Sequence, residues 1–409
     1  MLKHPLAQLP NGCGGCAAAR FRSRGRAATV ARMTKARLPR SRRTAPAFLS
    51  AALFATCLTG CDSGPPPPTP EQVRAQLQRL IPATVKDRSG WAADIQAALA
   101  SLEIEPTAQN LCSVLAVTEQ ESTFDADPAV PGLGRIARKE IETRAQRKHV
   151  PLFVVRAALQ LESPNGQTWD TRIAAARTEK ELSDLFEEMI SRVPMGERLL
   201  ARANPVHTGG PMQVSVAFAE AQAKERAYPY AAGGSIRHEV FTRRGGMYFG
   251  IAHLLGYPAA YDKPLFRFAD FNAGRYASRN AAFQNAVAVA TGIALDLDGD
   301  LVRYRKGKDG GKLGATESAV LTMVGKLGMT PGEIHRALAS AHRHSFEDSD
   351  LYARVFELAD KRNGKPLPRA TLPRIRLHSP KITRKLTTEW FATRVNRRYQ
   401  LCMAKTARF

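Results

Sequence analysis

The sequence lacks an apolar run long enough to cross a membrane comfortably. Residues 45–58 form an apolar segment, but it is shorter than the roughly 20 residues that a spanning helix needs. Hydrophobic residues make up 44% and charged residues 24% of the 409 positions, which are ordinary values for a globular chain. A protein of many membrane spans is therefore excluded, and so is a wholly disordered or collagen-like chain.

Metal-binding and phosphate-binding patterns are also missing. The nine His include no HExxH pair, and Cys13-x-x-Cys16 has no second Cys pair to complete a metal site. Residues 296–300 resemble a calcium loop, but the Gly comes one place early and residue 307 is Gly rather than Glu. Residues 307–313 lack the phosphate-loop spacing. We expect no metal and no cofactor.

Acidic residues are absent from the first sixty positions. These positions hold 11 of the 60 Lys and Arg and no Asp or Glu, so the net charge of +23 falls to +12 without them. A charge of this size favours anionic partners, namely nucleic acid, acidic lipid or a cell-wall polymer.

The same region has the layout of an export signal. A basic start (residues 35–43) precedes the apolar run, which ends in Leu58-Thr59-Gly60-Cys61. This resembles a bacterial lipoprotein signal, which implies that Cys61 is lipidated and opens the mature chain. A normal signal length places the true start at Met33. We expect a lipid anchor on the periplasmic face of a bacterial membrane, and Asp62 leaves inner versus outer membrane undecided.

Export also bears on the basic stretches near residues 303–312 and 381–398. A periplasmic lipoprotein rarely meets nucleic acid, so we predict that nucleic acid is not a partner of this protein. The anions available there are peptidoglycan carboxylates and lipid headgroups. The alternative is that these charges only form solvated faces of the protein. In an oxidising periplasm, Cys112 and Cys402 either pair as a disulfide or remain two buried thiols.

The mature chain is predicted to be all-α or nearly so. Residues 61–70 form a proline-rich tether, and Thr69-Pro70-Glu71-Gln72 predicts a capping box. Val73, Leu77, Leu80 and Ile81 recur at helical spacing, and Ile95, Leu99 and Leu102 mark a second helix. Pro106 opens a third helix. Later helices are expected at 135–162, 171–192, 212–226, 237–256, 279–295, 316–326, 331–343, 350–361 and 381–404.

One helix carries a candidate acid, Glu121. Val114, Val117 and Glu121 share a helical face, so Glu121 is expected to point inward. Burial and the helix C-terminus both raise a carboxyl pKa, and a protonated acid suits the cleavage of a sugar bond. Glu119 is the rival acid, about 200° around the helix. The alternative for Glu121 is a helix-end carboxylate satisfied by an Arg.

Three further segments follow in a suggestive order. The first is the loop Gly210-Pro211-Met212-Gln213-Val214. The second is Gly245-Gly246-Met247-Tyr248-Phe249-Gly250, whose pattern predicts a tightly packed helix, and the third is Ala269-Asp270-Phe271-Asn272-Ala273-Gly274. With Glu121-Ser122, they resemble the motifs of lysozyme-like lytic transglycosylases of bacterial cell walls. The whole chain also looks like a group of proteobacterial lipoproteins known only as a domain of unknown function.

The resemblance implies a domain arrangement and residue roles. A lysozyme-like domain would span 71–134 and 210–300, interrupted by a helical insertion (135–209) and followed by a helical extension (301–409). Glu121 would act as the single acid and then base. Met212, Gln213, Tyr248 and Asn272 would line the cleft, and peptidoglycan strands would be the substrate. The muramic acid itself would take part, giving a 1,6-anhydro product.

Two departures keep other functions open. The insertion is longer than a compact catalytic core uses, and Phe271 replaces the family's Tyr, which removes a hydroxyl. One alternative is a lipoprotein that binds glycan or a partner without cutting. Another is a plain hydrolase that activates water with Asp125 or Asp127.

Overall fold

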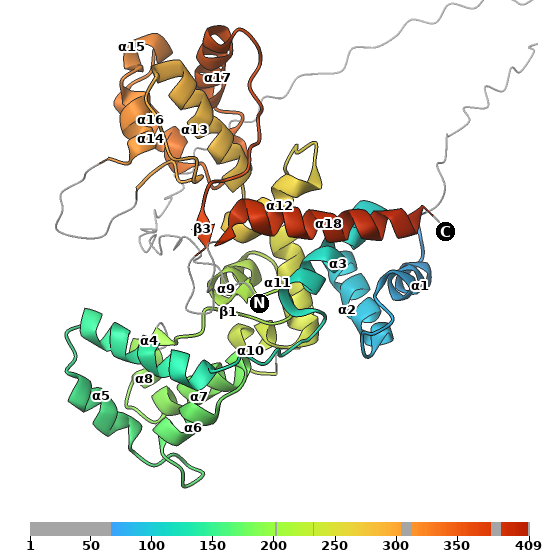
Figure 1. The fold of residues 1–409 in the computed structure, drawn as a ribbon, viewed down its shortest axis with the longest axis vertical. Coiled ribbons are helices and arrows are strands. Elements are labelled where there is room, and N and C mark those ends of the chain that lie inside the picture. Colours follow the sequence, from blue (N-terminus) through green and yellow to red (C-terminus); the bar gives the residue numbers. More distant parts are fainter. Residues whose placement is uncertain (1–66, 201–202, 232, 304–312, 378–385, 408–409) are drawn as a thin grey trace, which may run out of the picture. The chain divides into compact units, whose positions relative to one another are not determined.

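The computed structural model describes residues 67–407, apart from 201–202, 232, 304–312 and 378–385. Within these residues the chain is mostly helical, with two short antiparallel strand pairs, so the predicted all-α class is confirmed (Figure 1). Cys61, the export segment, most of the tether, residues 304–312 of the first basic stretch and residues 381–385 of the second lie outside the described residues. None of the helices described is long and apolar enough to cross a membrane.

Figure 1 shows the helices coloured in their order along the chain. Their bounds are α1 Pro70–Leu80, α2 Arg88–Ser101, α3 Ala108–Ser122, α4 Leu133–Arg147, α5 Leu152–Leu159, α6 Trp169–Ala175, α7 Glu179–Ser191, α8 Gly196–Leu200, α9 Val216–Glu225, α10 Ile236–Val240, α11 Arg243–Leu255, α12 Pro264–Ala273, α13 Ala277–Thr291, α14 Ala315–Leu321, α15 Val324–Leu327, α16 Pro331–Ala339, α17 Asp350–Asn363 and α18 Thr388–Thr406, with a 3-10 turn η2 at His344–Phe346. Strand β1 (Thr208–Gly209) pairs with β2 (Val214–Ser215), and β3 (Arg376–Leu377) pairs with β4 (Leu386–Thr387).

Capping decides where several helices begin. The predicted capping box of α1 is present at Thr69, and a second one opens α16 at Thr330. Several long helices expected from the sequence are instead split. Pro151 lies between α4 and α5. Thr178 is the N-cap of α7, which is separated from α6, and Thr242 is the N-cap of α11, which is separated from α10. A cap or proline inside an apolar pattern ends one helix and starts another without changing the pattern.

The buried side chains form three hydrophobic clusters, all within residues 73–402. The first core unites α1, α2, α3, α11, α12 and α18. The second core joins α13 to α14, α16 and α17, and the third core lies among α4 to α7. The third core belongs to the predicted insertion. The predicted C-terminal extension contributes to two cores, because α17 packs in the second and α18 in the first.

Helix α18 is fastened to α3 at several points. A disulfide joins Cys112 of α3 to Cys402 of α18, with their Cα atoms 5.5 Å apart. Of the two alternatives for these cysteines, the structure has the disulfide. Arg398 also lies 3.6 Å from Glu119. Because residues 112 and 119 meet residues 402 and 398 in reverse order, the two helices run antiparallel along this contact.

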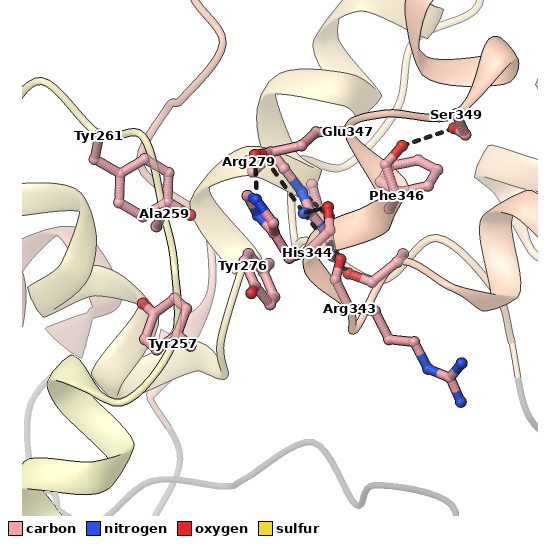
Figure 2. A network of polar contacts seen from close by, with 12 residues as sticks. Tyr257, Ala259, Tyr261, Tyr276, Arg279, Arg343, His344, Phe346, Glu347 and Ser349 are labelled. Atoms are coloured by element: carbon pink, nitrogen blue, oxygen red, sulfur yellow. Dashed lines mark hydrogen bonds and ion pairs between the residues drawn. The ribbon is translucent and has the colours of Figure 1, made fainter. Parts of the chain in front are cut away.

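A buried arginine ties α13 to the segment around η2 (Figure 2). The Arg279 guanidinium is almost completely buried and donates to the carbonyls of Ala341, Arg343 and His344 at 2.6–3.3 Å. It also stacks over Tyr276, 4.2 Å from the ring centroid. A buried cation is tolerated where its donors are all used in this way.

We expect the disulfide to contribute substantially to stability, because it closes a loop across 290 residues of sequence. Replacing Cys112 and Cys402 together by Ser should lower the free energy of unfolding by about 3–5 kcal/mol. Urea denaturation of the oxidised protein measures this. Reducing agent serves as the control, since it should destabilise the wild type and leave the double variant unchanged. Equal stability of the oxidised wild type and the double variant would contradict the expectation.

Candidate functional site

Glu121 lies in the last turn of α3, on the face that packs inward. Thr107 caps the start of this helix, and its inward face consists of Val114, Val117 and Thr118, all fully buried. Glu121 is only 1% exposed. Thr118 contacts the Met247 sulfur of α11 at 3.8 Å, so this face of α3 meets α11. The inward orientation expected from helical spacing is therefore what the structure shows.

The backbone just after Glu121 is unusual. Thr123 and Phe124 both have left-handed φ angles, 55° and 59°. Such angles are uncommon outside glycine, and they are strained for a β-branched or bulky residue. The Phe124 ring packs edge-on against Trp91 of α2 at 5.4 Å, which holds the turn. Strain of this kind concentrates at functional sites.

The other carboxylates near Glu121 have structural contacts. Glu119 lies on the opposite side of α3, half-buried beside Arg398 of α18. Asp125 is exposed and accepts a hydrogen bond from the Asp127 backbone at 3.1 Å, so it caps the turn. Asp127 is half-buried. Burial raises its pKa, although a hydrogen bond from Thr178 and the charge of Lys180 act in the opposite direction.

The Gly-Pro-Met-Gln segment forms the turn between β1 and β2, and it packs directly on α11. A Cβ atom on Gly246 would lie 2.3 Å from Pro211 Cδ, and one on Gly250 would lie 2.5 Å from Met212 Cβ. Distances this short do not occur between real atoms, so glycine is required for the contact. The Gly-rich pattern that predicted a tightly packed helix reflects this approach.

Gln213 and Tyr248 carry buried polar atoms with unused hydrogen-bonding capacity. Gln213 has a left-handed φ of 51°, and its amide nitrogen donates to the Gly210 carbonyl at 3.1 Å. Its amide oxygen and the Tyr248 hydroxyl have no partner among the described residues. Burial raises the pKa of Tyr248, so its hydroxyl stays protonated. Such atoms are rare in folded proteins and call for a ligand or water.

Asn272 lies near the end of α12 and contacts α18. The Thr388 hydroxyl donates to the Asn272 amide oxygen at 3.0 Å. The neighbouring Phe271 is buried and packs against the His253 ring, 5.1 Å between centroids. Sequence reasoning missed Thr388, because nothing in the sequence links it to a residue more than a hundred positions earlier.

A second buried carboxylate also escaped the sequence analysis. Glu239 of α10 accepts hydrogen bonds from Tyr228 (2.7 Å) and Arg244 (3.1 Å). Burial alone would raise its pKa, but the hydrogen bonds from Arg244, Tyr228 and the Gly233 backbone outweigh burial and lower it. The Tyr228 ring lies 5.3 Å from that of Tyr248. An ionised, fully paired Glu239 positions these rings rather than donating a proton.

The motif segments thus share one core. Met212, Tyr248 and Phe271 belong to the same hydrophobic cluster as Val114 and Val117 of α3. The predicted site residues Glu121, Met212, Gln213, Tyr248 and Asn272 are all 0–4% exposed. In the part of the chain that the structure describes, no group of His, Cys, Asp and Glu is arranged to hold a metal.

Comparison with known proteins gives a family but no activity. A family model described as "Protein of unknown function (DUF1615)" matches residues 84–405. The "Uncharacterized protein YaiW" of Escherichia coli (strain K12) is 52% identical over 351 residues, covering 85% of this chain and 95% of that protein. No solved structure matches the chain.

The glycine contacts of α11 yield a prediction. Gly246→Ala should destabilise the fold by about 1–3 kcal/mol, because the added methyl overlaps Pro211 and lies 2.9 Å from the Val240 carbonyl. This cost exceeds the ~1 kcal/mol that alanine gains in a helix. Gly325→Ala in α15 is the matched control, since nothing lies within 4 Å of its Cβ position. Thermal unfolding compares the two, and a Gly246→Ala protein as stable as the wild type would refute the close packing.

Proposed function

The chain belongs to the DUF1615 family of proteins of unknown function, and we propose that it is a lipid-anchored periplasmic lytic transglycosylase. In this proposal Glu121 is the single acid and base that cleaves the MurNAc–GlcNAc bond of peptidoglycan. The observation that carries it is the burial of Glu121 in the last helical turn, on the core that also holds the Met-Gln turn and Tyr248.

The environment of Glu121 suits the first proton transfer. Glu121 is withdrawn from water, and burial in general favours the neutral form of a carboxyl group, which is the form that can donate a proton. The acid protonates the glycosidic oxygen as the bond from that oxygen to the muramic acid C1 breaks. The left-handed turn at Thr123 and Phe124 fixes the helix end from which the acid is presented.

The second proton transfer uses the same residue. The Glu121 carboxylate takes the proton of the muramic acid's own C6 hydroxyl, whose oxygen bonds to C1 and closes the 1,6-anhydro ring. Glu121 ends protonated, as it began, and no water is consumed. The Gln213 amide oxygen and the Tyr248 hydroxyl supply hydrogen-bonding capacity for the sugar, which agrees with their lack of partners in the protein.

One observation favours a second candidate, a non-catalytic lipoprotein that binds glycan or a partner. The site residues are almost completely buried, and the Asn272 amide oxygen already accepts from Thr388. Both features are expected if the motif residues stabilise the core by packing and do not contact a substrate. The two candidates differ in what Glu121 does, and its substitution separates them.

We expect purified peptidoglycan incubated with residues 67–409, which hold all three described cores, to release anhydro-muropeptides. Glu121→Gln should lower the release at least about a hundredfold, because an amide cannot donate the required proton. Glu119→Gln is the matched control on the same helix and should retain activity. Mass spectrometry of the products measures both.

Other outcomes of this experiment discriminate the alternatives. Reducing ends in place of anhydro ends would indicate the hydrolase, and activity would then depend on Asp125 or Asp127. No release by any variant, with wild type and Glu121→Gln sedimenting equally with the sacculus, would reject the enzyme in favour of the binding lipoprotein.

Lipid attachment is tested separately. Cells fed labelled palmitate should incorporate the label into the wild-type protein and lose it with Cys61→Ser, because the thioether to the lipid forms only at that sulfur. Cys57→Ser, four residues earlier in the same apolar segment, is the matched control and should keep the label. A labelled Cys61→Ser protein would overturn the anchor.

A further inference from the structure

Exposed apolar side chains gather in one part of the described chain. Seven of its ten large exposed hydrophobic residues fall between positions 150 and 200: Val150, Phe153, Val154, Leu161, Val193, Met195 and Leu200. Scattered single residues of this kind are normal on a surface, but a cluster marks an interaction site. The first four belong to α5 and its two flanks.

The exposed residues of α5 form one continuous stripe. Within α5, positions 153, 154, 157 and 158 recur at spacings of three and four, so they share a helical face, and all four are apolar and exposed. Val150 and Leu161 are exposed apolar residues just beyond the two ends of the helix, and we count them with the stripe. Phe153 is 74% exposed and Leu161 is 64% exposed. The other face of α5 holds Val155 and Leu159, which pack in the third core. The helix is therefore already anchored to the protein, and its second, apolar face is left uncovered by the residues that the structure describes.

Positive charge borders the N-terminal end and one flank of this stripe. Arg147, Lys148 and His149 are exposed directly before it, and Arg156 lies exposed on its flank. Between positions 135 and 161 there are seven Lys or Arg and two Glu. Both Glu residues form ion pairs with arginine, Glu140 with Arg144 at 2.6 Å and Glu142 with Arg156 at 3.2 Å. Glu162, just past the stripe, is exposed.

We propose that α5 docks the insertion onto the surface of an anionic lipid bilayer. The apolar stripe enters the boundary between headgroups and acyl chains, with Phe153 as its deepest side chain, and Arg147, Lys148 and Arg156 lie at the level of the lipid phosphates. An apolar face bordered by cations is the pattern of interfacial helices. Buried protein interfaces instead tend to exclude lysine, which makes a lipid surface the better match.

This proposal is independent of Glu121 and of glycan cleavage. Vesicle binding needs no peptidoglycan, and muropeptide release needs no vesicles, so either activity can fail alone. It is also independent of Cys61, because residues 67–409 carry no lipidated cysteine. These residues hold all three described cores and the disulfide, so they serve as the test protein.

Flotation with vesicles of phosphatidylethanolamine and phosphatidylglycerol tests the docking. The wild type should float with these vesicles, weakly with pure phosphatidylcholine, and less as salt is raised. Phe153→Ser and Leu161→Ser should each weaken partitioning by about tenfold. Leu401→Ser is the matched control, because Leu401 on α18 is as exposed (61%) but lies outside the stripe. Circular dichroism checks that all variants are folded.

A direct probe of insertion is the variant Phe153→Trp, whose fluorescence should shift to the blue on adding the anionic vesicles. The proposal is overturned if the wild type does not float, or if Phe153→Ser and Leu161→Ser float as well as it does. Self-association in sedimentation that both substitutions abolish, without flotation, would assign the stripe to a second copy instead. Equal flotation with phosphatidylcholine would overturn the role of the cations.

Discussion

The candidate site depends on the approach of one turn to the backbone of α11. Gly246 and Gly250 leave room for Pro211 and Met212 to lie where any side chain on the helix would overlap them. A side chain at Gly245 would likewise overlap the carbonyl of Glu239 at the end of α10. This packing buries Met212 in the first core and places Gln213 in its left-handed conformation directly behind it. The inward face of α3, with Glu121, meets the same helix through Thr118 and Met247.

Helix α3 is therefore held from two sides, and its two glutamates differ accordingly. The face of Cys112 and Glu119 contacts α18 through the disulfide and Arg398. The face of Val114 and Glu121 contacts α11. One glutamate is half-exposed beside a cation, and the other is withdrawn from water. Because α18 also holds Asn272 through Thr388, the last helix of the chain contacts both the acid's helix and the end of α12.

Local sequence predicted the helical class, the inward face of α3 and the tight packing of α11, because each rests on spacing or on glycine. It did not predict where long patterns break, because a cap such as Thr242 changes one turn and leaves the apolar spacing intact. The sequence also did not predict which residues of α18 contact Asn272 and Glu119. Those contacts join positions far apart in the chain, and only the packed core brings them together. The exposure of the apolar stripe on α5 is not predictable from the sequence, because spacing alone does not distinguish a buried helical face from an exposed one.

Burial of the site bears on which reaction the proposed enzyme would perform. Hydrolysis needs a water molecule activated beside the sugar, and a second carboxylate is the usual means. Here the Asp125 carboxylate already accepts a hydrogen bond within the turn that it caps. Asp127 is hydrogen-bonded to Thr178 and interacts with the charge of Lys180. Glu119 faces α18. A transglycosylase needs no such water, since its nucleophile is a hydroxyl of the bound sugar and its single acid benefits from a dry environment. For catalysis by Glu121, the described contacts therefore favour an anhydro product over a hydrolysed one.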